Sequence, residues 1–406
     1  GKFFWPWVHL STFTGGTEAF QAALERVHAY DAQIAAKQNE ESAVRSCYFA
    51  MIEATLGRNE EARRLLWEGL DIFQKEGNLM RLGWAYSLLA LLESGRGRPL
   101  DADRFSQKAV TLWQQAGCSD APQQWRILPY LMQGRFPEAE VVNRKILSGQ
   151  RDPFVAEIDS SFGEPFFATA GIAVSKGQLE QAIDLFEKAI TLAEEEEQPW
   201  VGVFGFRHTL GGLFRLLGDW DRARPQIERE VAGAREADFS QRIATRLHEL
   251  ARLEFDLGNY PQAEAPLSEA LEIALRIDFL FAQALVLCQM GHTAGVQMKP
   301  EAAGHYRRAL DIAAEQGMNL IVLDVLLGAA RLIAAAGDVT QAVEWLALAV
   351  SHPNAEWETK QKAQKALASL RSGISPSDFQ AAEGRGRLLS IEEAINLARA
   401  ALGEAA

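Results

Sequence analysis

The stretch GNYPQAEAPLSEA, residues 258–270, has a glycine, an alanine five residues later and a second alanine seven residues after the first. The same spacing recurs about every forty residues along the chain. The positions equivalent to the glycine are Gly57, Gly97, Gly134, Gly177, Gly218, Gly258, Gln297 and Gly337. The paired alanines are Ala62, Ala102, Ala139, Ala182, Ala223, Ala263, Ala302 and Ala342. A period of roughly 20–50 residues is typical of stacked-repeat proteins, which bind partners on an extended concave surface.

Each unit is predicted to be a pair of helices around a tight turn. Residues 242–257 carry apolar side chains at helical spacing, and the GNYP stretch at 258–261 then interrupts the helix. Glycine takes the left-handed conformation that ends a helix, and proline fits the first turn of the next one. The two small residues of each unit lie two turns apart on one face, where they allow two helices to cross closely. The second small position holds Gly69, Ala109, Ala189, Ala270, Ala309 and Ala349, and it is lost at Ile146 and Glu230.

The stretch EQAIDLFEKAI, residues 180–190, closely resembles the second helix of the tetratricopeptide repeat. The resemblance extends over residues 41–350, which hold eight units. The period exceeds the roughly 34 residues of that family, which indicates longer helices. Repeats of this length are similar to those in the sensor regions of bacterial STAND signal-transduction ATPases and related transcription regulators. The resemblance implies an all-α fold, an α-solenoid of eight to nine helical hairpins with a C-terminal capping helix.

Both ends of the chain fit this resemblance. Residues 378–398, DFQAAEGRGRLLSIEEAINLA, resemble the closing signature of such regulators, and Ser390 with Glu393 predicts a capping box at the start of a last helix. The chain begins GKFFWPW, without an initiator methionine. We therefore expect an excised C-terminal region of a larger protein. The domains expected are a partial leading repeat or a junction with an upstream domain at 1–40, the repeats at 41–353 and capping helices at 354–406.

Composition restricts the possible functions. The formal net charge is −13, whereas nucleic-acid binding needs a basic stripe that displaces counterions from phosphates. No run of apolar residues is long enough to span a membrane. Three cysteines far apart in the sequence fit a reducing compartment, so we expect a cytoplasmic chain without membrane or nucleic-acid partners.

Sequence motifs of catalysis are absent. The chain has no phosphate-binding Gly-x4-Gly-Lys-Ser/Thr loop, no His-Glu-x-x-His, no Cys-x-x-Cys and no Gly-x-Ser-x-Gly. Its seven histidines are dispersed. We expect a chain that is not an enzyme, with no catalytic residues, cofactor or metal ligands, although the sequence leaves open a metal site formed by separate repeats.

The binding site is predicted on the first helices of the fourth to sixth units. Residues 162–171 and 200–212 combine aromatic residues with glycines, and each glycine inside a helix costs about 0.5–1 kcal/mol relative to alanine. Such helices either approach a neighbour closely or leave room for a ligand. The predicted ligand-binding residues are Phe162, Glu164, Phe167, Trp200, Phe204, Arg207, His208, Arg242, Thr245, Arg246, His248, Glu249 and Arg252. Aromatic walls and a cationic rim suit an anionic or mixed-character ligand; alternatively, the aromatics fill the core between repeats and the arginines pair with acidic residues.

The resemblance implies a sensor domain of a STAND-type ATPase. Its inducer, a small molecule, a peptide or a protein, would bind the concave face and relieve autoinhibition of the upstream ATPase domain of the same protein. The alternative is a tetratricopeptide scaffold or adaptor for protein–protein interaction. The chaperone-binding version of that scaffold uses a clamp of Lys and Asn residues. We do not expect it here, because the corresponding positions hold Cys47, Met51, Leu88, Ala121 and Trp125.

Overall fold

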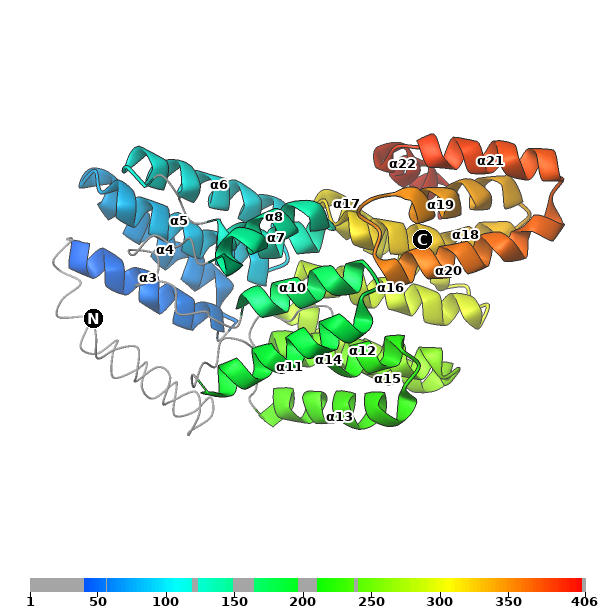
Figure 1. The fold of residues 1–406 in the computed structure, drawn as a ribbon, viewed down its shortest axis with the longest axis horizontal. Coiled ribbons are helices and arrows are strands. Elements are labelled where there is room, and N and C mark those ends of the chain that lie inside the picture. Colours follow the sequence, from blue (N-terminus) through cyan, green and yellow to red (C-terminus); the bar gives the residue numbers. More distant parts are fainter. Residues whose placement is uncertain are drawn as a thin grey trace.

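The computed structural model describes residues 40–55, 57–118, 123–148, 164–195, 210–236 and 240–403. Within these ranges every regular element is helical, with nineteen α-helices and two short 3-10 helices (Figure 1). This confirms the predicted all-α solenoid. Among the described helices, none combines the length and apolar character that crossing a bilayer requires.

Eight helical hairpins, called units one to eight below, follow one another along the chain. Their first and second helices are, in order, α3 (Glu40–Thr55) and α4 (Asn59–Lys75), α5 (Leu79–Gly95) and α6 (Pro99–Gln115), α7 (Ile127–Gln133) and α8 (Phe136–Leu147), α10 (Glu164–Ser175) and α11 (Leu179–Glu195), α12 (Leu210–Leu216) and α13 (Trp220–Glu236), α14 (Ser240–Asp256) and α15 (Tyr260–Arg276), α16 (Leu280–Val296) and α17 (Ala302–Glu315), and α18 (Asn319–Ala335) and α19 (Val339–Ser351). The remaining elements are η1 (Gln124–Arg126), α20 (Trp357–Leu370), η3 (Arg371–Gly373), α21 (Pro376–Leu388) and α22 (Ile391–Ala401).

The turn inside each unit follows the predicted glycine, with one exception. All seven of these glycines have φ between 72° and 104°, the left-handed region. In unit seven, however, the left-handed residue is Met298 and not Gln297. Lys299 there donates its N–H to the carbonyl of Ala294, as Asn259 does to Glu254 in the preceding unit. The prediction was therefore wrong by one residue, because no glycine marks the turn.

The paired alanines lie where the two helices of a unit cross. All eight have at most 1% of their surface exposed. At the second small position of unit one, a Cβ atom on Gly69 would lie 2.9 Å from the sulfur of Cys47. The close helix crossing that the small residues predict is therefore confirmed.

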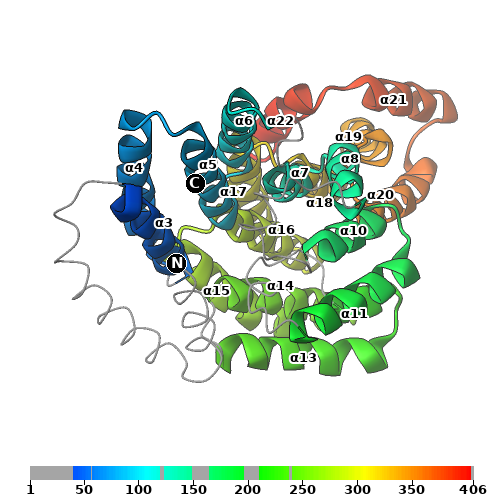
Figure 2. The ribbon, with the colours of Figure 1, turned by 60° about the vertical axis from the view of Figure 1, so that its left-hand side comes forward.

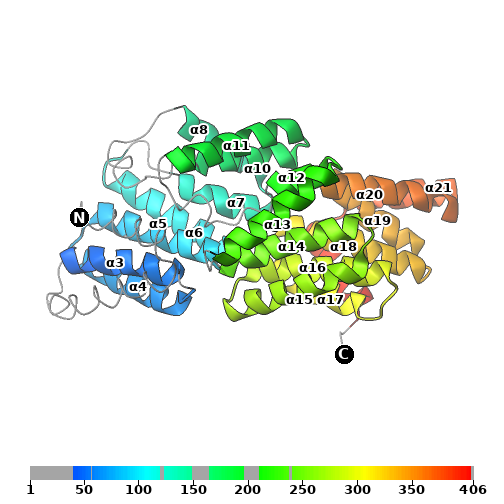
Figure 3. The same cartoon turned by 90° about the horizontal axis from the view of Figure 1, so that it is seen from below.

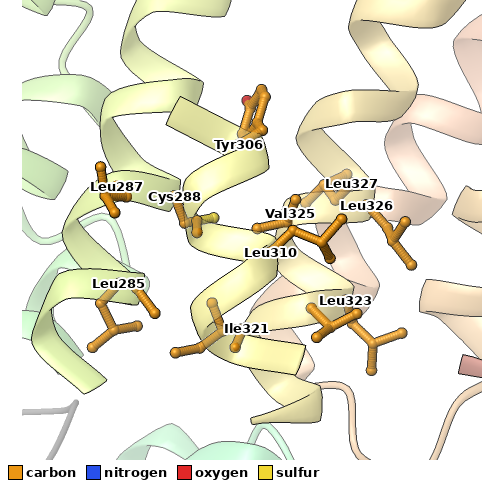
Figure 4. Packing of buried hydrophobic residues seen from close by; sticks show 14 of the residues in the cluster. Leu285, Leu287, Cys288, Tyr306, Leu310, Ile321, Leu323, Val325, Leu326 and Leu327 are labelled. Atoms are coloured by element: carbon orange, nitrogen blue, oxygen red, sulfur yellow. The ribbon is translucent and has the colours of Figure 1, made fainter. Parts of the chain in front are cut away.

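The first helices form the core of the solenoid, and the second helices cover it. In α16, twelve of seventeen residues are buried, whereas in α15 only five of seventeen are. Figure 4 shows the apolar side chains of α16 and α18, such as Leu285 and Ile321, packed between the helices. Because helices such as α16 are buried on most sides, their inner wall is not the open groove that a solenoid of this type suggests.

The enclosure arises because the solenoid folds back on itself. The turns of the early units contact the junctions that follow units six and eight (Figure 2). The guanidinium of Arg96 lies 2.9 Å from the carboxylate of Asp278, and the Asn354 side chain donates to the carbonyl of Gln133 at 3.3 Å. Units far apart in the sequence thus share one interior.

The C-terminal helices pack on the last two units. Helix α21 lies against α19, and α22 lies against α17 and α18. The predicted capping box of Ser390 and Glu393 is confirmed at the start of α22. At its other end, Arg399 pairs with Asp311 of α17 at 2.8 Å.

Because the solenoid folds back on itself, two glycine substitutions should lower the free energy of unfolding by different amounts. Gly77 and Gly97 both have left-handed φ, at 68° and 72°, but a Cβ atom on Gly97 would overlap the backbone of Phe281, whereas one on Gly77 meets nothing. Gly77→Ala should destabilise the protein by about 1–2 kcal/mol through backbone strain alone. Gly97→Ala should cost about 1–3 kcal/mol more, because unit two must move away from unit seven. Thermal melts of the two variants measure this, and equal losses would contradict the fold-back contact.

Candidate functional site

Helix α14 carries the predicted binding residues that the structure describes in full. Arg242, Thr245, Arg246, His248, Glu249 and Arg252 all belong to it. Glu164 and Phe167 lie on α10. The remaining predicted residues lie outside the described ranges: Phe162, Trp200, Phe204, Arg207 and His208.

The polar residues of α14 form a stripe along one face. Arg242, Arg246, Glu249 and Arg252 follow one another at intervals of three or four residues, which places them on one side of the helix, and Thr245 lies beside Arg246 three residues after Arg242. Thr245, Glu249 and Arg252 have at most 4% of their surface exposed. The stripe therefore faces the interior created by the fold-back, where each charge needs a partner.

The C-terminal half of the stripe joins a cluster of six charges, of which Asp256 and Lys362 are half-buried and the other four are buried. Arg252 donates to Glu249 at 2.7 Å and also to Glu358 of α20. Arg215 of α12 donates to both oxygens of Glu358, each at 3.2 Å. Helices α12, α14 and α20 come together in the view from below (Figure 3). We call this set the inner charge cluster: Arg215, Glu249, Arg252, Asp256, Glu358 and Lys362.

Charge is balanced in the inner charge cluster, which has three cations and three carboxylates. Burial by itself would raise the pKa of Glu358, but Arg215, Arg252 and Lys362 outweigh burial and hold that pKa well below its usual range. Glu358 is therefore ionised in the native state. Two of the predicted ligand-binding residues, Glu249 and Arg252, thus have protein partners, as the alternative reading of this stretch expects.

The N-terminal half of the stripe is not balanced in this way. Arg242 and Arg246, which we call the inner arginine pair, are one turn apart, and the Nε atom of Arg246 lies 3.7 Å from Glu230 of α13. Burial and the neighbouring Arg246 lower the pKa of Arg242 to about 10, and Glu230 opposes them only in part. The Nε atom of Arg242 is buried and has no hydrogen-bond partner in the described part of the chain.

Glu230 has other partners besides the inner arginine pair. Its Oε1 atom accepts from the Gln226 side chain at 3.1 Å and from the backbone N–H of Gly211 at 3.4 Å. Two guanidinium groups therefore share one carboxylate, of which Oε1 is already hydrogen-bonded and Oε2 faces Arg246. An arginine in such surroundings can bind a carboxylate or a phosphate through two parallel hydrogen bonds.

The sequence indicated α14 but not its partners. The polar stripe was found from helical spacing, whereas Arg215 and Glu358 are 143 residues apart and no local pattern links them. A buried charge on α20 could have been suspected only from Glu358 and Lys362, which are four residues apart.

Two protein families match parts of the sequence. Residues 206–276, which include α12 to α15, match the tetratricopeptide repeat family. Residues 14–96 match the family of anaphase-promoting complex subunit 5. Each match covers less than half of the chain, and the search of curated proteins found no match.

Two solved structures are similar to this chain at low sequence identity. A Rap protein complexed with competence and sporulation factor is 14% identical, with a TM-score of 0.58 over 88% of this chain and 100% of that chain. The Cut9–Hcn1 hetero-tetramer of the APC/C is 13% identical, with a TM-score of 0.49 over 88% of this chain and 62% of that chain. The likeness to the Rap protein shows a common fold, a tetratricopeptide-like solenoid.

The inner charge cluster predicts a large, pH-dependent effect of Glu358→Gln. Removing one partner of a buried ion pair leaves Arg215 and Arg252 uncompensated, so the free energy of unfolding should fall by about 3–5 kcal/mol at neutral pH. The matched control is Glu269→Gln, which breaks an exposed pair with Arg235 and should cost about 1 kcal/mol or less.

The sign of the pH dependence follows from the lowered pKa of Glu358. Its stabilising contribution is complete above the unfolded-state pKa of about 4.3, and it is lost as the pH falls toward the native-state pKa. The difference between wild type and Glu358→Gln should therefore shrink below about pH 4. Urea denaturation across this range measures it. A difference that stays constant or grows on acidification would contradict an ionised, stabilising Glu358.

Proposed function

We propose that this chain is a tetratricopeptide-type binding scaffold that holds an acidic segment of a partner protein or peptide. The single observation that carries the proposal is the inner arginine pair, two interior guanidinium groups that share Glu230. A carboxylate of the partner would supply the missing negative charge. Because the chain as a whole has a net charge of −13, this pair is a local exception and is suited to selecting an acidic segment.

The fold supports a binding role without identifying the partner. The Rap protein of the same architecture was crystallised with competence and sporulation factor, so a superhelix of this kind can hold a bound factor. Function resides in the site and not in the fold, however, and the arginines of α14 provide the chemical argument. The predicted contacts at Trp200, Phe204, Arg207 and His208 lie outside the described residues, and their part in this site stays a prediction.

A more specific candidate is the sensor domain of a bacterial STAND-type ATPase. One observation favours it: the inner arginine pair and the inner charge cluster share α14, and the cluster joins α14 to α20. A ligand on the arginines could therefore bias the contact with the C-terminal helices, in proportion to its difference in affinity for the two states. Autoinhibition of an upstream ATPase domain, in the cytoplasm, would be the output. A phosphate-binding loop elsewhere in the full gene would support this version over the adaptor.

Binding of acidic peptides tests the proposed scaffold function. We expect a fluorescent peptide rich in glutamate to bind the wild-type protein with an affinity that falls as salt rises, and a lysine-rich peptide of equal length not to bind. Arg242→Gln and Arg246→Gln should each weaken binding about 10–150-fold, the effect of losing a charged hydrogen bond of about 1.5–3 kcal/mol. Fluorescence anisotropy measures the affinities.

The control for this experiment is Arg235→Gln. Arg235 is an exposed arginine on α13 that pairs with Glu269, so its loss removes the same charge outside the interior. Affinity should be unchanged in this variant, and thermal melts should show that all three variants are folded. Equal losses in Arg235→Gln and Arg242→Gln would mean non-specific charge attraction, and the absence of acidic-peptide binding would refute the proposal.

A further inference from the structure

A cysteine, a histidine and an aspartate from neighbouring units converge in the C-terminal half of the solenoid. Cys288 and His292 are four residues apart on α16, so they lie on the same face of that helix. Asp324 belongs to α18, the first helix of the next unit. The Cys288 sulfur lies 3.5 Å from His292 Nε2 and 3.8 Å from Asp324 Oδ2, and His292 Nε2 lies 3.7 Å from Asp324 Oδ1. All three possible ligand atoms lie within 4.8 Å of one another.

The other ring nitrogen of His292 has a different partner. Its Nδ1 atom lies 2.9 Å from the hydroxyl of Tyr306 on α17. Tyr306 is buried, and burial raises the pKa of its phenol well above the usual value, so the group remains a neutral hydroxyl. Figure 4 shows Tyr306 and Cys288 in the packed core formed by α16, α17 and α18. The hydroxyl holds the imidazole ring and directs its Nε2 atom toward the other two side chains.

This arrangement differs from that of a catalytic cysteine. In a Cys–His–Asp catalytic group, one ring nitrogen faces the thiol and the opposite nitrogen faces the carboxylate that orients it. Here the thiol and the carboxylate both lie on the Nε2 side of His292, and a hydroxyl takes the opposite side. Donors that converge on one point, with an outer partner on the second nitrogen, are typical of metal ligands.

The distances fit a tetrahedral cation. With zinc–ligand distances of about 2.0–2.3 Å, neighbouring ligand atoms in a tetrahedral site lie about 3.3–3.6 Å apart. The Cys288 sulfur lies 3.5 Å from His292 Nε2, and these two atoms lie 3.8 and 3.7 Å from different oxygens of Asp324, so a rotation of the Asp324 carboxylate that brings one oxygen to both neighbours would complete the geometry. We propose that Cys288, His292 and Asp324 form a binding site for a divalent cation of the zinc class. Sulfur, imidazole and carboxylate together suit zinc and its usual substitute cobalt better than magnesium or calcium.

A cation can reach the proposed site from the solvent. The side chains of His292 and Asp324 are 10% and 18% exposed, whereas Cys288 is buried at the inner end of the group. Thr359 of α20 lies 3.5 Å from Asp324 Oδ1 and can hold the carboxylate in place. On coordination the thiol gives up its proton to solvent. Three protein ligands leave a fourth position for water or for a group of a partner.

The proposed cation site would tie together units seven and eight. Cys288 and His292 come from the first helix of unit seven, Asp324 from that of unit eight, and Thr359 extends the contact to α20. Binding to the native state alone must stabilise this half of the solenoid by mass action. The inference is independent of the proposed scaffold function, because none of these residues belongs to the α14 stripe.

Metal titration of the chelator-treated protein tests the site. We expect one equivalent of Zn²⁺ to remain after desalting, by elemental analysis, and the melting temperature to rise with Zn²⁺ but not with Mg²⁺. Co²⁺ should give a thiolate-to-cobalt charge-transfer band together with visible bands of tetrahedral intensity. A wild-type protein that retains no Zn²⁺ would overturn the proposal.

Variants assign the ligands. Cys288→Ser, His292→Gln and Asp324→Asn should each weaken Zn²⁺ binding at least tenfold, and Cys288→Ser should also abolish the charge-transfer band. Tyr306→Phe keeps the buried ring but removes the outer hydroxyl, so it should weaken binding about 10–100-fold. Cys118→Ser is the matched control, since the Cys118 sulfur lies beside Met80 in a different core cluster and should leave binding unchanged.

Two further outcomes decide between this site and others. If one ligand variant fails to fold, the remaining two still test the assignment. Retention of one equivalent with wild-type affinity in the folded ligand variants would place the cation elsewhere and refute the site. Loss of binding in Cys118→Ser, with Cys288→Ser unaffected, would do the same.

Discussion

The structure depends on the close approach of early turns to later junctions. Gly97 has left-handed φ, and it also leaves no space for a side chain against the backbone of Phe281. Where the two segments meet, Arg96 pairs with Asp278, a residue that itself has positive φ. This contact brings unit two onto units six and seven, and the bond from Asn354 to Gln133 brings unit three onto the segment after unit eight, so a stack of simple hairpins becomes a solenoid with an enclosed interior. An open superhelix would leave the same first helices facing solvent.

Because the interior is enclosed, the charged residues inside it can be compared by whether each one has a partner. An ionised group taken out of water costs several kcal/mol unless it is paired, so most interior charges should have partners. The inner charge cluster meets this condition with three cations and three carboxylates. Within the described part of the chain the inner arginine pair does not, because Arg242 and Arg246 share Glu230. The group of Cys288, His292 and Asp324 is different again, since its donors converge on one point.

The fold supports a statement about architecture, whereas the site supports a proposal about binding. The tetratricopeptide match to residues 206–276 and the likeness to the Rap protein concern architecture, and many unrelated functions use such a solenoid. The charge on α14 is the basis of the proposed acidic partner. The scaffold and the sensor would use the same inner face. Only in the sensor would a change in the contact between α14 and α20 act on an upstream domain.

Local rules acting within a few residues determined the hairpins. The glycine–alanine spacing located the turns and the helix crossings, and the capping box at Ser390 located the last helix. The turn at Met298 was misplaced because neither it nor Gln297 is a glycine, so the sequence held no marker. Only the tertiary structure decided which charges meet. Arg215 and Glu358, 143 residues apart, are joined by the fold-back, and Asp324 reaches Cys288 and His292 only because first helices of adjacent units pack together. Helical spacing describes one helix, and it contains no information about which later helix will lie against it.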